Sequence, residues 1–415
     1  MSPFLSGWRR GALLLALSAA SAWAQKFYTY IDDLGPDYVQ LAWGTTAGDN
    51  TIGRSSVSHG EAVIKIDRRT LQSRPNTVTV SGLQPDHTYT YEISIGGKKI
   101  GEGQIRTWAA QSNKLCFFVI GDYGTGTRVQ YQVAQAMWQE FQKRADSDNP
   151  VRFVISTGDN IYGDVSGFLI GIRHTGNADS DWTNKFFEPY EPLLARIPWF
   201  PSLGNHDGNE TESQSDLTAY LDNMPFPGGT PGRYYHFNYA GLAEFFALDS
   251  TRNSESGQPR PAYSDDAPEF QWMRREFPKA TAPWVIPYYH HPVFNAGPLH
   301  VPGMRELQHW MPLFEAAHVH VVFNGHEHNL QVSEMNDLSF GIRFITSGAG
   351  GELRRTSVRK RMRAANIAAW APQNHFLVVE IEGKTMRVTP ISFVPLDIID
   401  VNGNPLQPPF VITLP

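Results

Sequence analysis

Five short apolar segments of this 415-residue sequence are each followed by side chains that could bind metal ions or transfer protons. An apolar run of this length is typical of a buried strand, so the residues after it would lie at the carboxyl end of that strand. The polar residues at these ends are Asp122, Asp159 with Tyr162, Asn205 with His206, His290, and His326 with His328. Taken singly, each could be an ordinary turn residue. Their repeated placement at strand ends indicates one shared site.

The ligand types at these strand ends indicate the kind of cation that they would hold. They supply carboxylate and amide oxygens and imidazole nitrogens, without a thiolate. Of the 14 histidines, eight lie within residues 290–328, which composition alone would rarely produce. Such a ligand set suits iron, manganese or zinc. Two of these ions about 3.5–4 Å apart, sharing a carboxylate, could hold both the attacking and the leaving oxygen of an in-line phosphoryl displacement.

The elements that would position this site change in type near residue 111. Residues 25–110 contain short alternating runs separated by Gly, Pro, Asn and Asp, which predicts a small all-β sandwich. From residue 111 onward, apolar strands alternate with helical stretches at 129–144 and 306–317. This pattern predicts an α/β layered domain whose ligands lie beyond the carboxyl ends of its strands. A hairpin around residues 382–384 is expected to complete a second sheet.

Residues 1–24 have the three parts of a secretory signal, with Arg9-Arg10, an apolar run, and a small-residue cleavage site before Gln25. The apolar run is far shorter than the roughly 20 residues that a bilayer span needs, so no membrane span is expected after cleavage. The mature protein is therefore predicted to be secreted or periplasmic. Cys116 is the single cysteine, which excludes a disulfide within the chain. The formal charge of −6 gives no indication of a nucleic-acid partner.

The motifs resemble a known family when they are read in order. Gly-Asp-x-Gly, Gly-Asp-x-x-Tyr, Gly-Asn-His-Asp, His-x-Pro and Gly-His-x-His form the signature of the calcineurin-like metallophosphoesterases, and the tyrosine marks the purple acid phosphatases among them. The resemblance spans roughly residues 116–351 and implies a two-sheet αββα catalytic domain over residues 111–415. Residues 82–91 resemble a loop and tyrosine-bearing strand of fibronectin type III domains, so the sandwich of residues 25–110 is expected to be of that type.

The resemblance also implies a role for each motif residue. An Fe(III) site is implied at Asp122, Asp159, Tyr162 and His328. A second site for divalent Fe, Zn or Mn is implied at Asp159, Asn205, His290 and His326, with Asp159 as the bridge. His290 is preferred to His291 because the family ligand is the first residue of His-x-Pro, and because neighbouring strand residues point to opposite faces. His206 and His300 are implied as catalytic residues that face the substrate.

The implied function is that of a secreted acid phosphatase that hydrolyses phosphate monoesters of small substrates. A metal-bound hydroxide would attack phosphorus in line, and His206 would assist departure of the alcohol. A phosphodiesterase or nucleotidase of the same fold is the first alternative. A metallophosphoesterase with two divalent ions and no ferric tyrosinate is the second. The third, from another class, is a non-catalytic secreted binding protein with a structural metal site.

A basic run between Arg354 and Arg363 allows two interpretations. It could be a solvated loop, or it could attract phosphorylated substrates toward the cleft.

Overall fold

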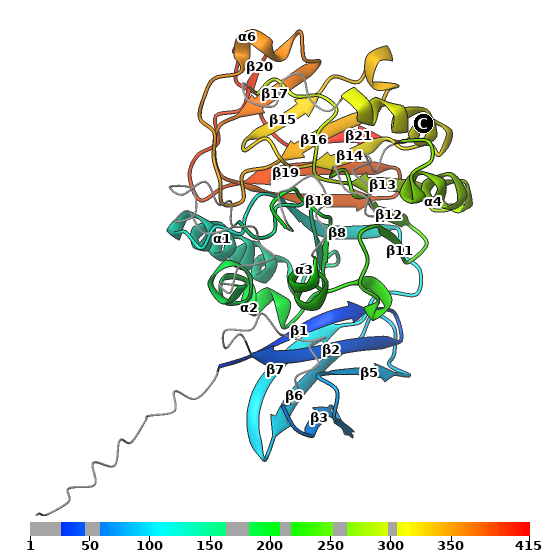
Figure 1. The fold of residues 1–415 in the computed structure, drawn as a ribbon, viewed down its shortest axis with the longest axis vertical. Coiled ribbons are helices and arrows are strands. Elements are labelled where there is room, and N and C mark those ends of the chain that lie inside the picture. The colour runs from blue at the N-terminus through cyan, green and yellow to red at the C-terminus, as the bar shows by residue number, and fades with distance from the viewer. Residues whose placement is uncertain (1–25, 46–58, 163–181, 208–216, 252–263, 298–304) are drawn as a thin grey trace, which may run out of the picture.

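The computed structural model describes residues 26–45, 59–162, 182–207, 217–251, 264–297 and 305–415. The predicted signal peptide and His300 lie outside these residues. Two parts follow one another along the chain, with an all-β part at the bottom of Figure 1 and a larger layered part above it. No helix in the described part of the chain is long and apolar enough to cross a membrane.

The all-β part is a sandwich of two antiparallel sheets, with strand orders β1-β2-β5 and β4-β3-β6-β7. Its strands are β1 Phe27–Leu34, β2 Tyr38–Thr45, β3 Ala62–Ile66, β4 Arg69–Ser73, β5 Thr77–Ser81, β6 Thr88–Ile95 and β7 Lys98–Arg106. Leu41, Ile64 and Ile93 are fully buried in a core that both sheets share. The Tyr89 hydroxyl accepts a hydrogen bond from the backbone nitrogen of Gln84 at 2.8 Å, as in the tyrosine corner of such sandwiches. The predicted fibronectin type III-like sandwich is thus confirmed.

The layered part contains two mixed sheets, with strand orders β10-β9-β8-β18-β19-β21 and β11-β12-β13-β14-β16-β15-β17-β20. The first sheet comprises β8 Lys114–Ile120, β9 Val151–Ser156, β10 Trp199–Pro201, β18 Phe376–Glu382, β19 Thr385–Ile391 and β21 Phe410–Thr413. The second comprises β11 Tyr235–Tyr239, β12 Ala243–Ala247, β13 Trp284–Tyr288, β14 Val321–Asn324, β15 Leu330–Ser333, β16 Arg343–Ser347, β17 Ile367–Ala371 and β20 Ile399–Asp400. The predicted hairpin forms from β18 and β19, but it extends the sheet that contains β8 rather than the other sheet.

Helices cover the outer face of each sheet. The first sheet is covered by α1 Arg128–Arg144, α2 Glu188–Leu194 and α3 Thr218–Asn223, and the second by α4 Pro268–Glu276, α5 Met311–Ala316 and α6 Arg359–Met362. Helix α1 begins where the Thr127 side chain accepts a hydrogen bond from the backbone nitrogen of Gln130. The predicted helix at 306–317 is a 3-10 helix, Arg305–Trp310, that leads directly into α5.

Alternation along the strands explains why four layers form. In β8, Leu115, Phe117 and Val119 belong to the apolar cluster between the two sheets. The intervening Cys116, Phe118 and Ile120 belong to the cluster beneath the helices. A strand that is apolar on both faces must be covered on both sides, by the second sheet on one and by helices on the other. The predicted αββα architecture is confirmed.

The sandwich is joined to the layered part by buried contacts as well as by the chain. The Trp108 ring lies 5.6 Å from the ring of Phe153 and 5.2 Å from that of Tyr239, measured between centroids. The buried Asp33 carboxylate accepts a hydrogen bond from the backbone nitrogen of Gly228 at 2.6 Å. The sandwich is therefore packed against the layered part rather than tethered to it.

Candidate metal centre

The five strand ends that carry the motifs meet at one edge of the two sheets. Strands β8, β9 and β10 run parallel in the first sheet, and β12, β13, β14 and β16 run parallel in the second. Their carboxyl ends therefore open onto a common crevice. Contacts across this crevice join residues of both sheets: the backbone nitrogen of His326 donates a hydrogen bond to the Asp122 carboxylate, and His290 Nδ1 lies 2.8 Å from the Thr157 carbonyl oxygen.

The backbone at these strand ends turns sharply. Asp122, Asp159 and His326 all have positive φ angles, of 56°, 50° and 69°, which non-glycine residues seldom adopt. Such strain concentrates at functional sites, where it aims side chains inward. Close approach explains the glycine of the third motif, since a Cβ atom on Gly204 would lie 2.0 Å from the backbone nitrogen of Asp159. The motif glycines thus permit the contact between loops that brings the polar side chains together.

A first cluster of four polar side chains surrounds the Tyr162 hydroxyl. Its oxygen lies 3.2 Å from Asp122 Oδ1, 3.2 Å from Asp159 Oδ2 and 3.1 Å from His328 Nε2. His328 Nε2 also lies 3.3 Å from Asp122 Oδ1. Both carboxylates are buried. These are the four residues predicted for the Fe(III) site.

A second cluster surrounds His290 Nε2. This nitrogen lies 3.2 Å from Asp159 Oδ2, 3.1 Å from Asn205 Oδ1 and 3.1 Å from His326 Nδ1. These are the four residues predicted for the divalent site. Asp159 Oδ2 contacts both clusters, so one carboxylate oxygen lies between them.

The donor and acceptor pattern of the second cluster suits a cation. His290 Nδ1 lies 2.8 Å from the Thr157 carbonyl, which can only accept, so Nδ1 carries a hydrogen. When His290 is neutral, it therefore directs the lone pair of Nε2 toward the oxygens of Asp159 and Asn205. Lone pairs that converge in this way repel one another unless a positive charge lies between them, so these residues fit a metal ion.

The close packing of these polar groups raises the pKa values of His290 and Tyr162. The Asp159 carboxylate raises the pKa of His290 to about 9, even though burial acts in the opposite direction. Burial, together with Asp122 and Asp159, raises the pKa of Tyr162 well above its usual value. The metal-free site would thus keep protons on an imidazole and a phenol. Cations that bind here would release these protons, which makes binding pH-dependent.

His291 lies beside the second cluster although the sequence argument excluded it. One ring nitrogen of His291 lies within 4.8 Å of ring nitrogens of His290 and His326. Its Nδ1 atom is 2.9 Å from Ser250 Oγ. The rule that neighbours point to opposite faces fails because β13 ends at Tyr288, so both histidines lie beyond the strand.

His206 lies at the edge of the first cluster. Its backbone nitrogen donates a hydrogen bond to Asp159 Oδ1 at 2.9 Å, and its ring centroid is 4.7 Å from that of Tyr162. The residue is half-buried, unlike the fully buried Asp122 and His290. This position allows the imidazole to reach both the cluster and a molecule in the crevice.

Two buried carboxylates support the site and were not predicted. Asp207 accepts hydrogen bonds from the backbone nitrogens of Gly204, Asn160 and Ile161, and so joins the second and third motifs. Its place after Asn205-His206 in the third motif was the available signal. Burial, with the nearby Asp159 charge, raises the pKa of Asp207 to about 7.

Glu327, between His326 and His328, is the second of these carboxylates and is fully buried. It accepts hydrogen bonds from the side-chain amides of Asn295 and Asn329, each at 3.2 Å, and lies 3.4 Å from Arg354 Nη1. The network ties the His-Glu-His loop to the loop that follows the His-x-Pro motif. Arg354, from the basic run, therefore belongs to the surroundings of the site.

Comparisons with known proteins agree with this geometry. The sequence model of the calcineurin-like phosphoesterase family matches residues 116–330. Purple acid phosphatase 3 of Arabidopsis thaliana is 31% identical over 257 residues, which is 57% of this chain and 63% of its own length. Purple acid phosphatase 4 of the same plant is 30% identical over 259 residues, covering 57% of this chain and 68% of its own length. The match thus spans about two thirds of each relative.

A solved structure shows the same fold. Purple acid phosphatase PPD1 from yellow lupin seeds superposes with a TM-score of 0.65 at 15% identity, over 94% of this chain and 74% of the lupin chain. The matched family, the two plant relatives and the arrangement of the motif residues lead to one conclusion. This chain belongs to the calcineurin-like phosphoesterase family and, within it, to the purple acid phosphatases.

Proposed function

We propose that this protein is a dinuclear metal phosphoesterase that hydrolyses phosphate monoesters of small molecules, with highest activity at acid pH. The observation that carries the proposal is the position of Asp159 Oδ2, which lies 3.2 Å from Tyr162 Oη in one cluster and 3.2 Å from His290 Nε2 in the other. A carboxylate shared in this way is how two-metal phosphoesterases hold their ions side by side.

The two ligand sets favour different cations. Asp122, Asp159, Tyr162 and His328 would hold Fe(III), because the first set can supply two carboxylates and a phenolate, whose charges suit a trivalent ion. The second set shares Asp159 and adds Asn205, His290 and His326, so it would hold divalent Fe, Zn or Mn.

Two cations supply charge neutralisation at the phosphoryl group and activation of water when they are bound. The residues of this chain would bind the two cations and orient the side chains around them. The Thr157 carbonyl fixes the His290 ring, and Asp207 fixes the loop that carries Asn205 and His206. His206, at the edge of the first cluster, would donate a proton to the leaving alkoxide.

Rates on a substrate panel test the reaction class. Purified protein with measured metal content should hydrolyse an aryl phosphate with kcat/KM at least about tenfold above that for the bis-aryl diester, from acid to mildly alkaline pH. A ratio in favour of the diester would instead support the phosphodiesterase alternative. Two bound metals without turnover of either ester would support the non-catalytic binding protein.

The colour of the iron-loaded protein tests the role of Tyr162. We expect a visible absorption band from a tyrosine phenolate on Fe(III), and its loss in Tyr162→Phe, because the phenylalanine ring lacks the oxygen that lies among three ligands. Tyr131→Phe, which removes a hydroxyl bonded to Glu188 away from the site, should keep the band. A band that survives Tyr162→Phe would favour the assignment of the ferric site to other residues.

We also propose that the enzyme is secreted or periplasmic, with residues 1–24 removed on export. Cys116, the single cysteine, is free and buried, which is compatible with an oxidising compartment. An exported protein whose N-terminus is not Gln25 would contradict this cleavage site.

A further inference from the structure

The turn between β15 and β16 exposes large apolar side chains. Met335 is 41% exposed, Leu338 69% and Phe340 41%, and these are three of the six large apolar side chains that are exposed in the described part of the chain. The turn is rigidly built. The Asn336 side chain accepts hydrogen bonds from the backbone nitrogens of Leu338 and Ser339, and Phe340 has a φ angle of 53°. The apolar side chains are therefore held outward by the turn.

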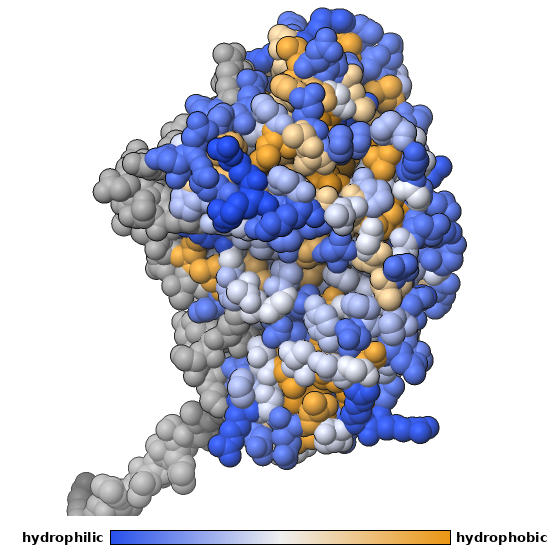
Figure 2. Space-filling view, turned by 90° about the vertical axis from the view of Figure 1, so that its right-hand side faces the viewer, coloured by the Kyte–Doolittle hydropathy of each residue, from blue (hydrophilic) through white to orange (hydrophobic). Residues whose placement is uncertain are grey.

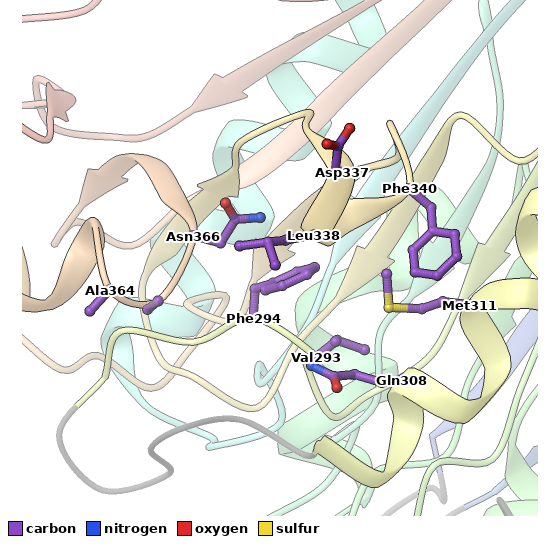
Figure 3. A pocket seen from close by; sticks show the side chains of 10 residues that line it. Val293, Phe294, Gln308, Met311, Asp337, Leu338, Phe340, Ala364 and Asn366 are labelled. Carbon is purple, nitrogen blue, oxygen red and sulfur yellow. The ribbon is translucent and has the colours of Figure 1, made fainter.

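A cleft of about 480 Å³ lies beneath this turn (Figure 3). Leu338 projects over Phe294 on one side, and the ring of Phe340 lies near Met311 on the other. The opposite wall is formed by residues 364–366, which follow α6. The side chains of Asn336 and Asn366 hydrogen-bond to each other, at 2.7 and 3.3 Å, and join the two walls. The apolar surface thus continues from the exposed side chains into the cleft.

A strongly basic segment of the chain ends in residues 364–366, which form one wall of this cleft. Residues 354–366 contain six Lys and Arg residues and no acidic residue, although the whole chain has a formal charge of −6. Three of these cations are engaged, since Arg354 contacts Glu327, and Arg359 and Arg363 donate to Asn402. Arg355, Lys360 and Arg361 are exposed, and within the described residues their side chains form neither an ion pair nor a hydrogen bond. Their charge is therefore available to an external anion.

This part of the molecule lies away from the metal centre. Strand β15 leads from the His328 loop to the turn, and β16 runs back to the site. Strand β17, which follows α6, pairs with β15 so that Ile367 lies opposite Ser333, beside the turn. Helix α6 lies at the end of the molecule opposite the sandwich in Figure 1. Lys360 and Arg361 of α6 therefore belong to a separate surface and not to the substrate crevice.

We propose that this surface, the docking edge formed by Met335, Leu338, Phe340, Lys360 and Arg361, binds an anionic lipid membrane. The apolar side chains of the turn would enter the interfacial layer, and the α6 cations would contact lipid phosphates. Figure 2 shows apolar residues beside hydrophilic ones on the upper part of one face of the molecule. Glu334 and Asp337 on the turn oppose the attraction, but the six cations of residues 354–366 outnumber them.

The charges favour a lipid surface over a protein or a second copy of this chain. A second copy would bring the same unpaired cations against one another. A bilayer supplies many mobile phosphates and an apolar layer at one depth, which matches a protruding apolar turn with cations beside it. Each such cation contributes about fivefold in affinity for an anionic bilayer.

Vesicle sedimentation with the mature full-length protein tests the docking edge. Binding is expected to vesicles of phosphatidylcholine with phosphatidylglycerol, to weaken as salt rises, and to be absent with phosphatidylcholine alone. Leu338→Ser with Phe340→Ser, and separately Lys360→Gln with Arg361→Gln, should each lower binding by at least about tenfold. Turnover of a soluble phosphate ester should stay unchanged in both double variants.

Matched control variants remove an exposed apolar side chain, or two exposed cations, at positions outside the docking edge. Val411→Ser replaces a residue that is 51% exposed on β21, and Arg68→Gln with Lys98→Gln removes two exposed cations of the sandwich. Neither control should change vesicle binding. No binding to anionic vesicles, or equal losses in controls and test variants, would overturn the proposal. A concentration-dependent dimer would also overturn the proposal if the double variant Leu338→Ser with Phe340→Ser abolished it. The edge would then be an interface between copies of this chain.

Discussion

Asp159→Asn is expected to release both metal ions and to lower kcat for phosphate ester hydrolysis by at least about 10³-fold. The reason is the shared oxygen, since Asp159 Oδ2 is the atom that contacts both Tyr162 Oη and His290 Nε2. An amide keeps the shape of the side chain but removes the negative charge between the two ions. Metal content per protein chain and steady-state rates, measured on the same preparation, check both parts of the expectation.

Two further variants sharpen this result. Asp122→Asn alters a carboxylate that contacts Tyr162 and His328, so it should release the ion of that cluster and leave the second ion bound. Asp146→Asn makes the same chemical change at an exposed carboxylate and should leave metal content and rate unchanged. An Asp159→Asn protein that retains two ions per chain would show that Asp159 is not the shared ligand.

His206→Asn is expected to lower kcat by roughly 10²–10⁴-fold while both metal ions stay bound. The imidazole lies beside Tyr162 at the half-buried edge of the site, and the His206 backbone nitrogen donates a hydrogen bond to Asp159. The loss should be largest for alkyl phosphates, whose leaving alkoxide needs a proton. It should be small for aryl phosphates with an acidic phenol as leaving group.

The dependence on the leaving group separates two roles of this histidine. Equal losses for alkyl and aryl esters would mean that His206 binds the phosphoryl group without donating a proton. Loss of a metal ion would mean that it supports the ligands instead. His87→Asn, at an exposed histidine of the sandwich, serves as the matched control and should retain full activity and both ions.

The sequence predicted the layers and the motif strands well because their signals are local. Burial on both faces of β8 is visible as an unbroken apolar run, and the glycines mark where the strands end. The hairpin of β18 and β19 was predicted correctly as a pair, but it was placed in the wrong sheet. Pairing within a hairpin depends on nearby residues, whereas its partner β8 lies more than 250 residues earlier in the chain.

The same distinction applies to the metal centre. Residue types and motif order were enough to nominate seven candidate metal ligands. Only the tertiary structure showed that one oxygen of Asp159 lies between two clusters, because that depends on five loops meeting at one edge. It also placed His291 beside His326, since the alternation of strand side chains ends with β13.

Charged residues show the limit of sequence most clearly. The basic run between Arg354 and Arg363 is uniform in sequence, yet folding divides it among the Glu327 network, the Asn402 turn and an exposed surface. Buried Asp207 and Glu327 resembled ordinary turn residues until their hydrogen-bond partners were known. Local patterns thus determined the strands and the layers, and the motif order with its family resemblance nominated the candidate ligands. The shared carboxylate, its supporting network and the docking edge were decided by contacts between residues distant in the chain, which no local pattern encodes.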